Sequence, residues 1–153
     1  MLLLAFLIGV VAGLRSLTAP AVVAWAAHRH QLNLQGSALA FMGSRAAVGV
    51  FTLLAVLELV ADQLPSTPSR TKPTGLGARI VTGALSGASI AASASQSVAF
   101  GGLSGAAGGV VGAFAGYEAR TRLVRALKVP DFVIASLEDA VAITAGLWIL
   151  SRS

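Results

Sequence analysis

Charged and hydroxyl side chains interrupt an otherwise apolar sequence near its start. In the stretch GVVAGLRSLTAP (residues 9–20), Arg15, Ser16 and Thr18 stand between two apolar runs. A charged residue within a membrane span costs roughly 2.5–3.5 kcal/mol on insertion scales and seldom faces lipid. We therefore expect Arg15 to face the protein interior, a cavity or a charged partner. A helix beginning at Pro20 would have free N–H groups, so an anion could bind here; snorkelling of the arginine to the headgroups is the alternative.

Carboxylates form the second candidate set, which consists of Glu58, Asp62, Glu118, Glu138 and Asp139. They could line a site for a cation or a proton at the cytoplasmic mouth of a membrane bundle. Equally, they could form structural salt bridges with nearby arginines, the candidates being Arg79, Arg120 and Arg122.

Several other chemistries lack the residues they need. The chain has no cysteine, which excludes disulfides and thiol catalysis. His28 and His30 are two residues apart and could touch a metal, but a polar loop is the favoured interpretation. No nucleophile and base stand at a diagnostic spacing, and TGLGAR is too short for a dinucleotide loop. We therefore expect no enzyme, no cofactor and no metal site.

The elements that carry these residues are apolar. Hydrophobic residues make up 56% of the 153 residues and charged residues only 11%, which is typical of a membrane protein. Five segments approach the roughly 20 residues that a helix needs to cross a bilayer. They cover residues 2–27, 37–61, 78–94, 98–117 and 132–150, and the first lacks the basic start of a signal peptide. The sequence predicts an all-α fold, a polytopic transmembrane bundle of about five spans within a single domain, residues 1–153.

Basic residues predict the orientation. One set of connections would carry Arg70, Lys72, Arg79, Arg120, Arg122, Arg125 and Lys128. The other side would carry only Arg29 and Arg152. With five spans, the positive-inside rule places the N-terminus in the cytoplasm and the C-terminus outside. The run RTRLVRALK predicts an interfacial helix on anionic lipid, and a net charge of +5 is too small and scattered for a nucleic-acid surface.

Glycines recur at helical spacing. Those expected to mediate helix packing are Gly9, Gly13, Gly83, Gly87, Gly105, Gly109, Gly112 and Gly116. Such spacing lets backbones approach closely where lipid provides no hydrophobic drive between helices. The alternatives are packing within the chain and a contact between copies, for which a dimer is favoured.

Two parts of the chain also resemble each other. Residues 9–18 align with residues 112–121, and the segments that follow align with Arg45 opposite Asp139. This predicts a 2 + 1 + 2 inverted-topology repeat with halves at residues 1–62 and 98–153, linked by an irregular loop (63–77) and a span (78–94). In that arrangement Arg15 and Arg45 would lie toward the outer half of the membrane and the carboxylates toward the cytoplasmic half.

Three stretches carry a resemblance to a known family: GLRSLTAPAVVAW, LPSTPSRTKPTGLGARIVTGALSGA and LEDAVAI. With them the chain resembles the small bacterial membrane proteins of domain of unknown function 4126. The resemblance implies a bacterial inner-membrane protein and brings no activity with it. The repeat and the charges within spans favour a channel or transporter for an ion or small solute. The alternative is a non-catalytic membrane-organising or partner-binding protein with structural salt bridges.

Overall fold

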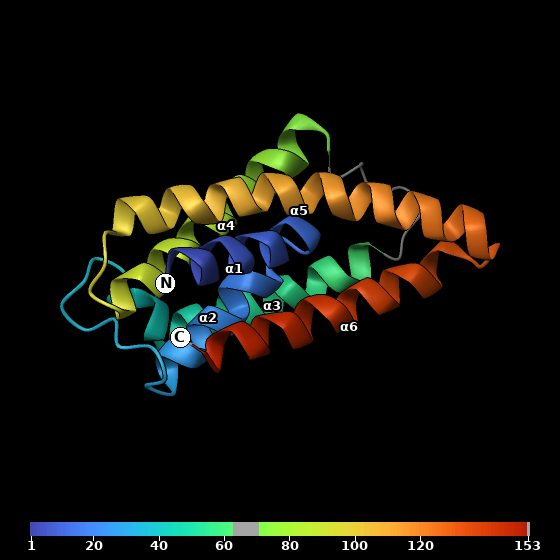
Figure 1. Cartoon of the computed structure of the whole chain (residues 1–153). Coiled ribbons are helices and arrows are strands. Elements are labelled where there is room, and N and C mark those ends of the chain that lie inside the picture. Colours follow the sequence, from blue (N-terminus) through green and yellow to red (C-terminus); the bar gives the residue numbers. More distant parts are fainter. Residues whose placement is uncertain (63–70, 153) are drawn as a thin grey trace.

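The computed structural model describes residues 1–62 and 71–152, and these residues form helices without a strand. The elements are α1 (Leu2–Leu14), α2 (Thr18–His28), the short 3-10 helix η1 (Ala40–Gly43), α3 (Arg45–Ala61), α4 (Pro73–Ser93), α5 (Val98–Leu127) and α6 (Asp131–Leu150). They lie along a common direction as an elongated bundle (Figure 1). The predicted all-α class is confirmed.

The first apolar segment is a helical hairpin, not one interrupted span. α1 and α5 run in the same direction, since Gly9 packs on Gly105 and Gly13 on Gly112. α6 returns along α5. α2 runs parallel to α6, since Arg15 before α2 contacts Asp139 and Val22 further along α2 lies against Gly146. α2 is therefore antiparallel to α1, and the chain turns back at residues 15–17. With 13 and 11 residues, these helices are roughly 20 and 17 Å long, too short to cross a bilayer.

Glycines set the spacing at the centre of the bundle. One face of α5 packs against α4, with Gly105 on Gly83 and Gly109 on the carbonyl of Arg79. A second face packs against α1, with Gly112 on the carbonyl of Val10. The predicted close packing is therefore confirmed for the contacts of Gly9, Gly13, Gly83, Gly87, Gly105, Gly109 and Gly112, and Gly116 is buried. Both glycine faces are occupied within the chain, so the expected dimer, which stays a prediction, would need another surface.

The direction of α1 also contradicts the inverted repeat. That repeat requires the first and fourth apolar segments to run in opposite directions, but α1 and α5 run in the same direction. Within the two similar stretches, Gly9, Gly13 and Gly112 all lie in the contact between α1 and α5.

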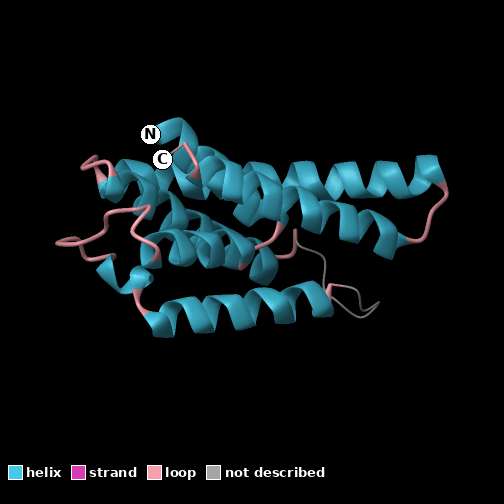
Figure 2. Cartoon of the chain, turned by 90° about the horizontal axis from the view of Figure 1, so that it is seen from below, coloured by secondary structure: helices cyan, strands magenta, loops and turns pink. Residues whose placement is uncertain are grey.

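The ends of the bundle differ from the five-span expectation. Both termini lie at one end, together with the connection from α2 to α3 (Figures 1 and 2). The expectation that the termini lie on opposite sides is wrong, because the hairpin adds a turn inside the bundle. α4 begins at Pro73, so part of the expected loop 63–77 is helical; residues 63–70 lie outside the described residues.

Two helices, α5 and α6, are long and apolar enough to cross a membrane. α5 has 30 residues and continues to Leu127, well beyond the end predicted at Tyr117.

Candidate functional site: a charged hairpin turn

Arg15 occupies the turn between α1 and α2. Its extended backbone (φ −136°, ψ 108°) ends α1, and its N–H donates to the carbonyl of Val11 at 2.8 Å. The preceding Gly13 packs against Ala113, close to the midpoint of α5. The Arg15 side chain is fully buried. A permanent positive charge is therefore held about half-way along an apolar bundle.

Two carboxylates from different helices neutralise this charge. Asp62, directly after α3, and Asp139, in α6, both form ion pairs with the Arg15 guanidinium. The carbonyl of Ala135 accepts a further hydrogen bond at 3.4 Å. The aspartate side chains keep 13% and 16% of their exposure, so the carboxylate side of the ion pair is partly accessible while the arginine is not. Among the described residues, Arg15 Nε has no hydrogen-bond acceptor.

The backbone of the turn is bound by Glu58 of α3. Its carboxylate accepts hydrogen bonds from the N–H groups of Ser16 and Leu17, each at 2.8 Å, and from Ser16 Oγ at 2.6 Å. These N–H groups precede the first turn of α2, where the helix dipole favours negative charge. The predicted anion site at the start of this helix thus holds an anion of the protein itself. Thr18 is buried in the first turn of α2.

Arg79 of α4 binds the other side of the turn. Its Nε donates to the carbonyl of Gly13 at 3.0 Å, and its Nη1 donates to the carbonyl of Gly75 at the same distance. The last carbonyls of a helix lack partners within the helix, so Arg79 satisfies one at the end of α1. The turn is therefore held by α3, α4 and α6.

The remaining carboxylates lie elsewhere. Arg120 makes a two-pronged contact with Asp131, with Nε and Oδ1 2.9 Å apart, and Glu138 is 3.7 Å from its Nη1. Glu118 is exposed and pairs with Arg122 one turn along α5 at 2.7 Å. The five carboxylates thus do not form one cluster, and only Glu58, Asp62 and Asp139 contact the hairpin turn or its arginine.

Two predictions about the arginines are wrong. Arg45 is exposed at the start of α3, at the other end of that helix from Glu58 and Asp62. Ser44 beside it is a helix cap that accepts from the N–H of Ala47 at 3.0 Å. Arg15 and the carboxylates were also expected in opposite halves of the bundle. Both errors follow from the inverted alignment, which the hairpin invalidates.

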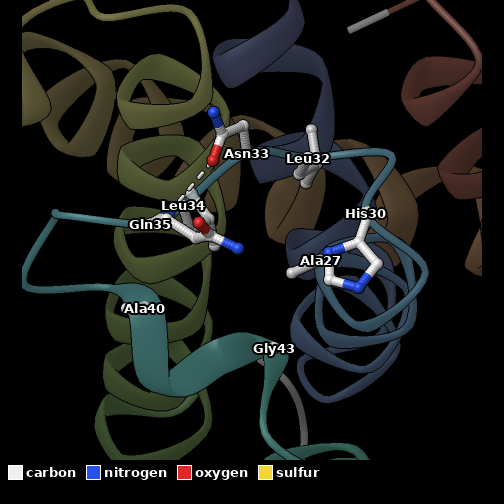
Figure 3. A pocket seen from close by; sticks show the side chains of 8 residues that line it. All are labelled: Ala27, His30, Leu32, Asn33, Leu34, Gln35, Ala40 and Gly43. Atoms are coloured by element: carbon white, nitrogen blue, oxygen red, sulfur yellow. Dashed lines mark hydrogen bonds between the residues drawn. The ribbon is translucent and has the colours of Figure 1, made fainter.

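A pocket of about 420 Å³ lies at the end of the bundle that also holds both termini. There the α2–α3 connection folds over the end of α2 (Figure 3). Its lining residues are uncharged or weakly basic: Ala27, His30, Leu32, Asn33, Leu34, Gln35, Ala40 and Gly43. The ring of His28 is oriented by its Nδ1, which lies 2.9 Å from the carbonyl of Gly43. Within residues 1–62 and 71–152, no group of three His, Cys, Asp or Glu side chains could hold a metal ion.

Comparisons with known proteins place the chain in a family without assigning an activity. No curated protein and no solved structure matches it. Residues 2–151, nearly the whole chain, match the family described as domain of unknown function 4126. The match includes the stretches GLRSLTAPAVVAW and LEDAVAI, on which the resemblance to this family was based. The chain therefore belongs to the family of domain of unknown function 4126.

Proposed function

We propose that this chain is a multi-pass protein of the bacterial inner membrane that passes an ion or small solute, with the hairpin turn as its gate. The outer surface supports the membrane setting. Large apolar side chains on four different helices are exposed, including Leu53, Val81, Leu103 and Leu147. Water would make such a surface prone to association, whereas hydrocarbon would solvate it.

The observation that carries the transport proposal is the position of the buried turn. Many transporters place their binding sites near the bilayer midplane, where a helix is broken and its free backbone groups meet ions or substrates. Here the break between α1 and α2 lies half-way along α5, and it brings helix-end backbone groups, Arg15 and three carboxylates together. Asp62 and Asp139 are partly accessible, so an ion or solute could compete for the aspartates without first reaching the arginine.

A second function, membrane organisation without transport, is favoured by a different observation. α1, α4 and α5 are in backbone contact through glycine, and the described partners of Arg15 already neutralise it. A bundle closed in this way could act as a rigid scaffold or bind a partner protein. The two functions differ in whether the turn must open. Neither includes catalysis.

Flux measurements distinguish them. We expect protein reconstituted in liposomes to pass at least one of protons, potassium, chloride or a small neutral solute above the rate of protein-free vesicles. Asp139→Asn keeps the side-chain size but removes one charge from Arg15, and we expect it to change that flux at least about tenfold. Arg45→Gln, which changes an exposed charge at the other end of α3, should leave it unaltered. No flux of any of the four probes, with folded protein in the vesicles, would favour the scaffold.

A further inference from the structure

We propose that the last turns of α5, with the start of α6, form a docking surface for anionic phospholipid headgroups. This anionic-lipid surface consists of Arg125, Lys128, Leu123, Leu127 and Phe132. It is independent of the transport proposal, because none of these residues contacts the hairpin turn. Its position follows from length: the 30 residues of α5 extend about 45 Å, whereas the hydrocarbon core is about 30 Å thick. The end of α5 must therefore reach beyond the hydrocarbon into the headgroups.

Some of the basic residues at this end form ion pairs within the chain and others do not. Arg120 is paired with Asp131, and Arg122 is paired with Glu118. Arg125 and Lys128 are exposed and have no ion-pair partner among the described residues. Two cations are thus left at the surface after the internal pairs are made. Phosphate groups of anionic lipids are the ligands that such cations meet at the cytoplasmic face of a membrane.

Apolar residues accompany the two cations. Leu123 and Leu127 stand one turn apart on α5 and are 44% and 57% exposed, and Phe132 at the start of α6 is also 57% exposed. Arg125 lies on a different side of α5 from the two leucines, because helical residues two apart do not share a face. An apolar side opposite a basic side is typical of a helix in the membrane interface. This pairing favours a lipid over a free phosphate or a nucleic acid.

The backbone at Lys128 decides which replacement can test this surface. Lys128 ends α5 in the left-handed conformation (φ 52°), and its N–H donates to the carbonyl of Val124. Glycine is the usual residue at such a position, because a side chain there is strained. Glycine is therefore a replacement for Lys128 that the backbone accepts.

Lys128→Gly removes the charge and leaves a residue that adopts this backbone conformation without strain. A loss of lipid binding in this variant is therefore not caused by a loss of folding. We expect the double variant Arg125→Gln/Lys128→Gly to keep the helicity and thermal stability of the wild type. In detergent, its apparent affinity for phosphatidylglycerol, measured by native mass spectrometry, should fall about 25-fold, or about fivefold for each cation near the surface. Binding of zwitterionic phosphatidylcholine should not change.

The matched control removes two cations from the opposite end. Arg29 and Arg152 lie over the rings of Trp25 and Trp148, at 5.2 and 5.4 Å from the ring centroids. Arg29→Gln/Arg152→Gln has the same change in net charge, and we expect it to retain most of the phosphatidylglycerol affinity. An equal loss in both double variants would overturn the proposal in favour of net charge alone. Wild-type protein that binds both lipids equally would overturn it as well.

A third variant identifies the ligand. Leu123→Ser/Leu127→Ser keeps both cations and removes the apolar side. We expect it to weaken binding of phosphatidylglycerol while leaving any binding of glycerol phosphate unchanged. Unchanged lipid affinity would show that the headgroup alone is bound and that the apolar side has no role, which would contradict the surface as defined.

Discussion

Arg15 is the residue on which the hairpin turn depends. A guanidinium without counter-charges would be strongly unfavourable in an apolar interior, and removing one partner of a buried pair typically costs 3–5 kcal/mol. Its fork of donors suits several acceptors at once, and here it reaches Asp62, Asp139 and the carbonyl of Ala135. A lysine has the same charge but cannot span these three acceptors in one plane.

We therefore expect Arg15→Leu to lower the free energy of unfolding by about 3–5 kcal/mol, because two aspartates would lose their counter-charge. Arg15→Lys should fall between this variant and the wild type. Thermal unfolding of all three proteins in one detergent measures the difference. Arg45→Leu is the control, since it makes the same replacement at an exposed residue. If Arg15→Leu and Arg45→Leu unfold at the same temperature, Arg15 does not stabilise the turn.

Sequence reasoning was sound for Arg15 and failed for Arg45, and the difference is physical. Arg15 has apolar residues on both sides within about one turn, so it has no route to water except through the protein. Arg45 follows Ser44, a helix cap, and so begins its helix at the end of the bundle. The expectation for Arg45 rested on its alignment with Asp139 and took no account of a helix cap at Ser44.

At the scale of elements, the C-terminal end of α3 holds the hairpin turn in place. Glu58 and Asp62 are one turn apart and share a face of α3, so a single helix end holds both the backbone and the arginine of the hairpin turn. The spacing of these two acids could have indicated a common partner. Which partner could not be inferred from the sequence, because the hairpin brings residues 15–17 to the end of α3 instead of the opposite side of the membrane.

Close packing of α1 on α5 gives a prediction for single glycines. A methyl group at Gly112 would overlap the backbone at Val10, so we expect Gly112→Ala to destabilise the protein by about 1–3 kcal/mol. Gly49 is the matched control within α3, because nothing lies within 4 Å of the position of its Cβ. Gly49→Ala should be neutral or stabilising by up to about 1 kcal/mol through helix propensity. Thermal unfolding in detergent provides the comparison, and equal effects at the two positions would contradict the α1–α5 contact.

Helix ends were predicted less well than helix centres. The span beginning at Val98 was expected to stop at Tyr117 because charged residues follow. The helix continues through them, since Glu118 pairs with Arg122 along α5 and Arg120 pairs with Asp131 of α6. Hydropathy predicts which part of a helix can lie in hydrocarbon. It does not predict the residue at which the helix ends.

For the whole molecule, the hairpin changes the topology. Both termini lie opposite the end that carries Arg120, Arg122, Arg125 and Lys128 (Figure 1). By the positive-inside rule, this basic end should face the cytoplasm and both termini should face outward.

Single cysteines test this orientation without background, since the chain has none of its own. In intact cells, we expect cysteines at Leu2 and Ser151 to react with an impermeant maleimide and a cysteine at Lys128 to react only after the membrane is opened. Labelling of Leu2 and Ser151 on opposite sides of the membrane would restore the five-span arrangement and contradict the hairpin.

The hairpin also has a consequence for how the protein is made. α1 and α2 leave the ribosome first, yet Arg15 depends on Asp62, which follows α3, and on Asp139, in the last helix. During synthesis Arg15 lacks one of its two counter-charges until α6 has joined the bundle. A chain that stops before α6 would leave the turn incompletely neutralised and prone to stay out of the hydrocarbon. We therefore expect a chain truncated before α6 to assemble incompletely and to be degraded faster than the intact chain.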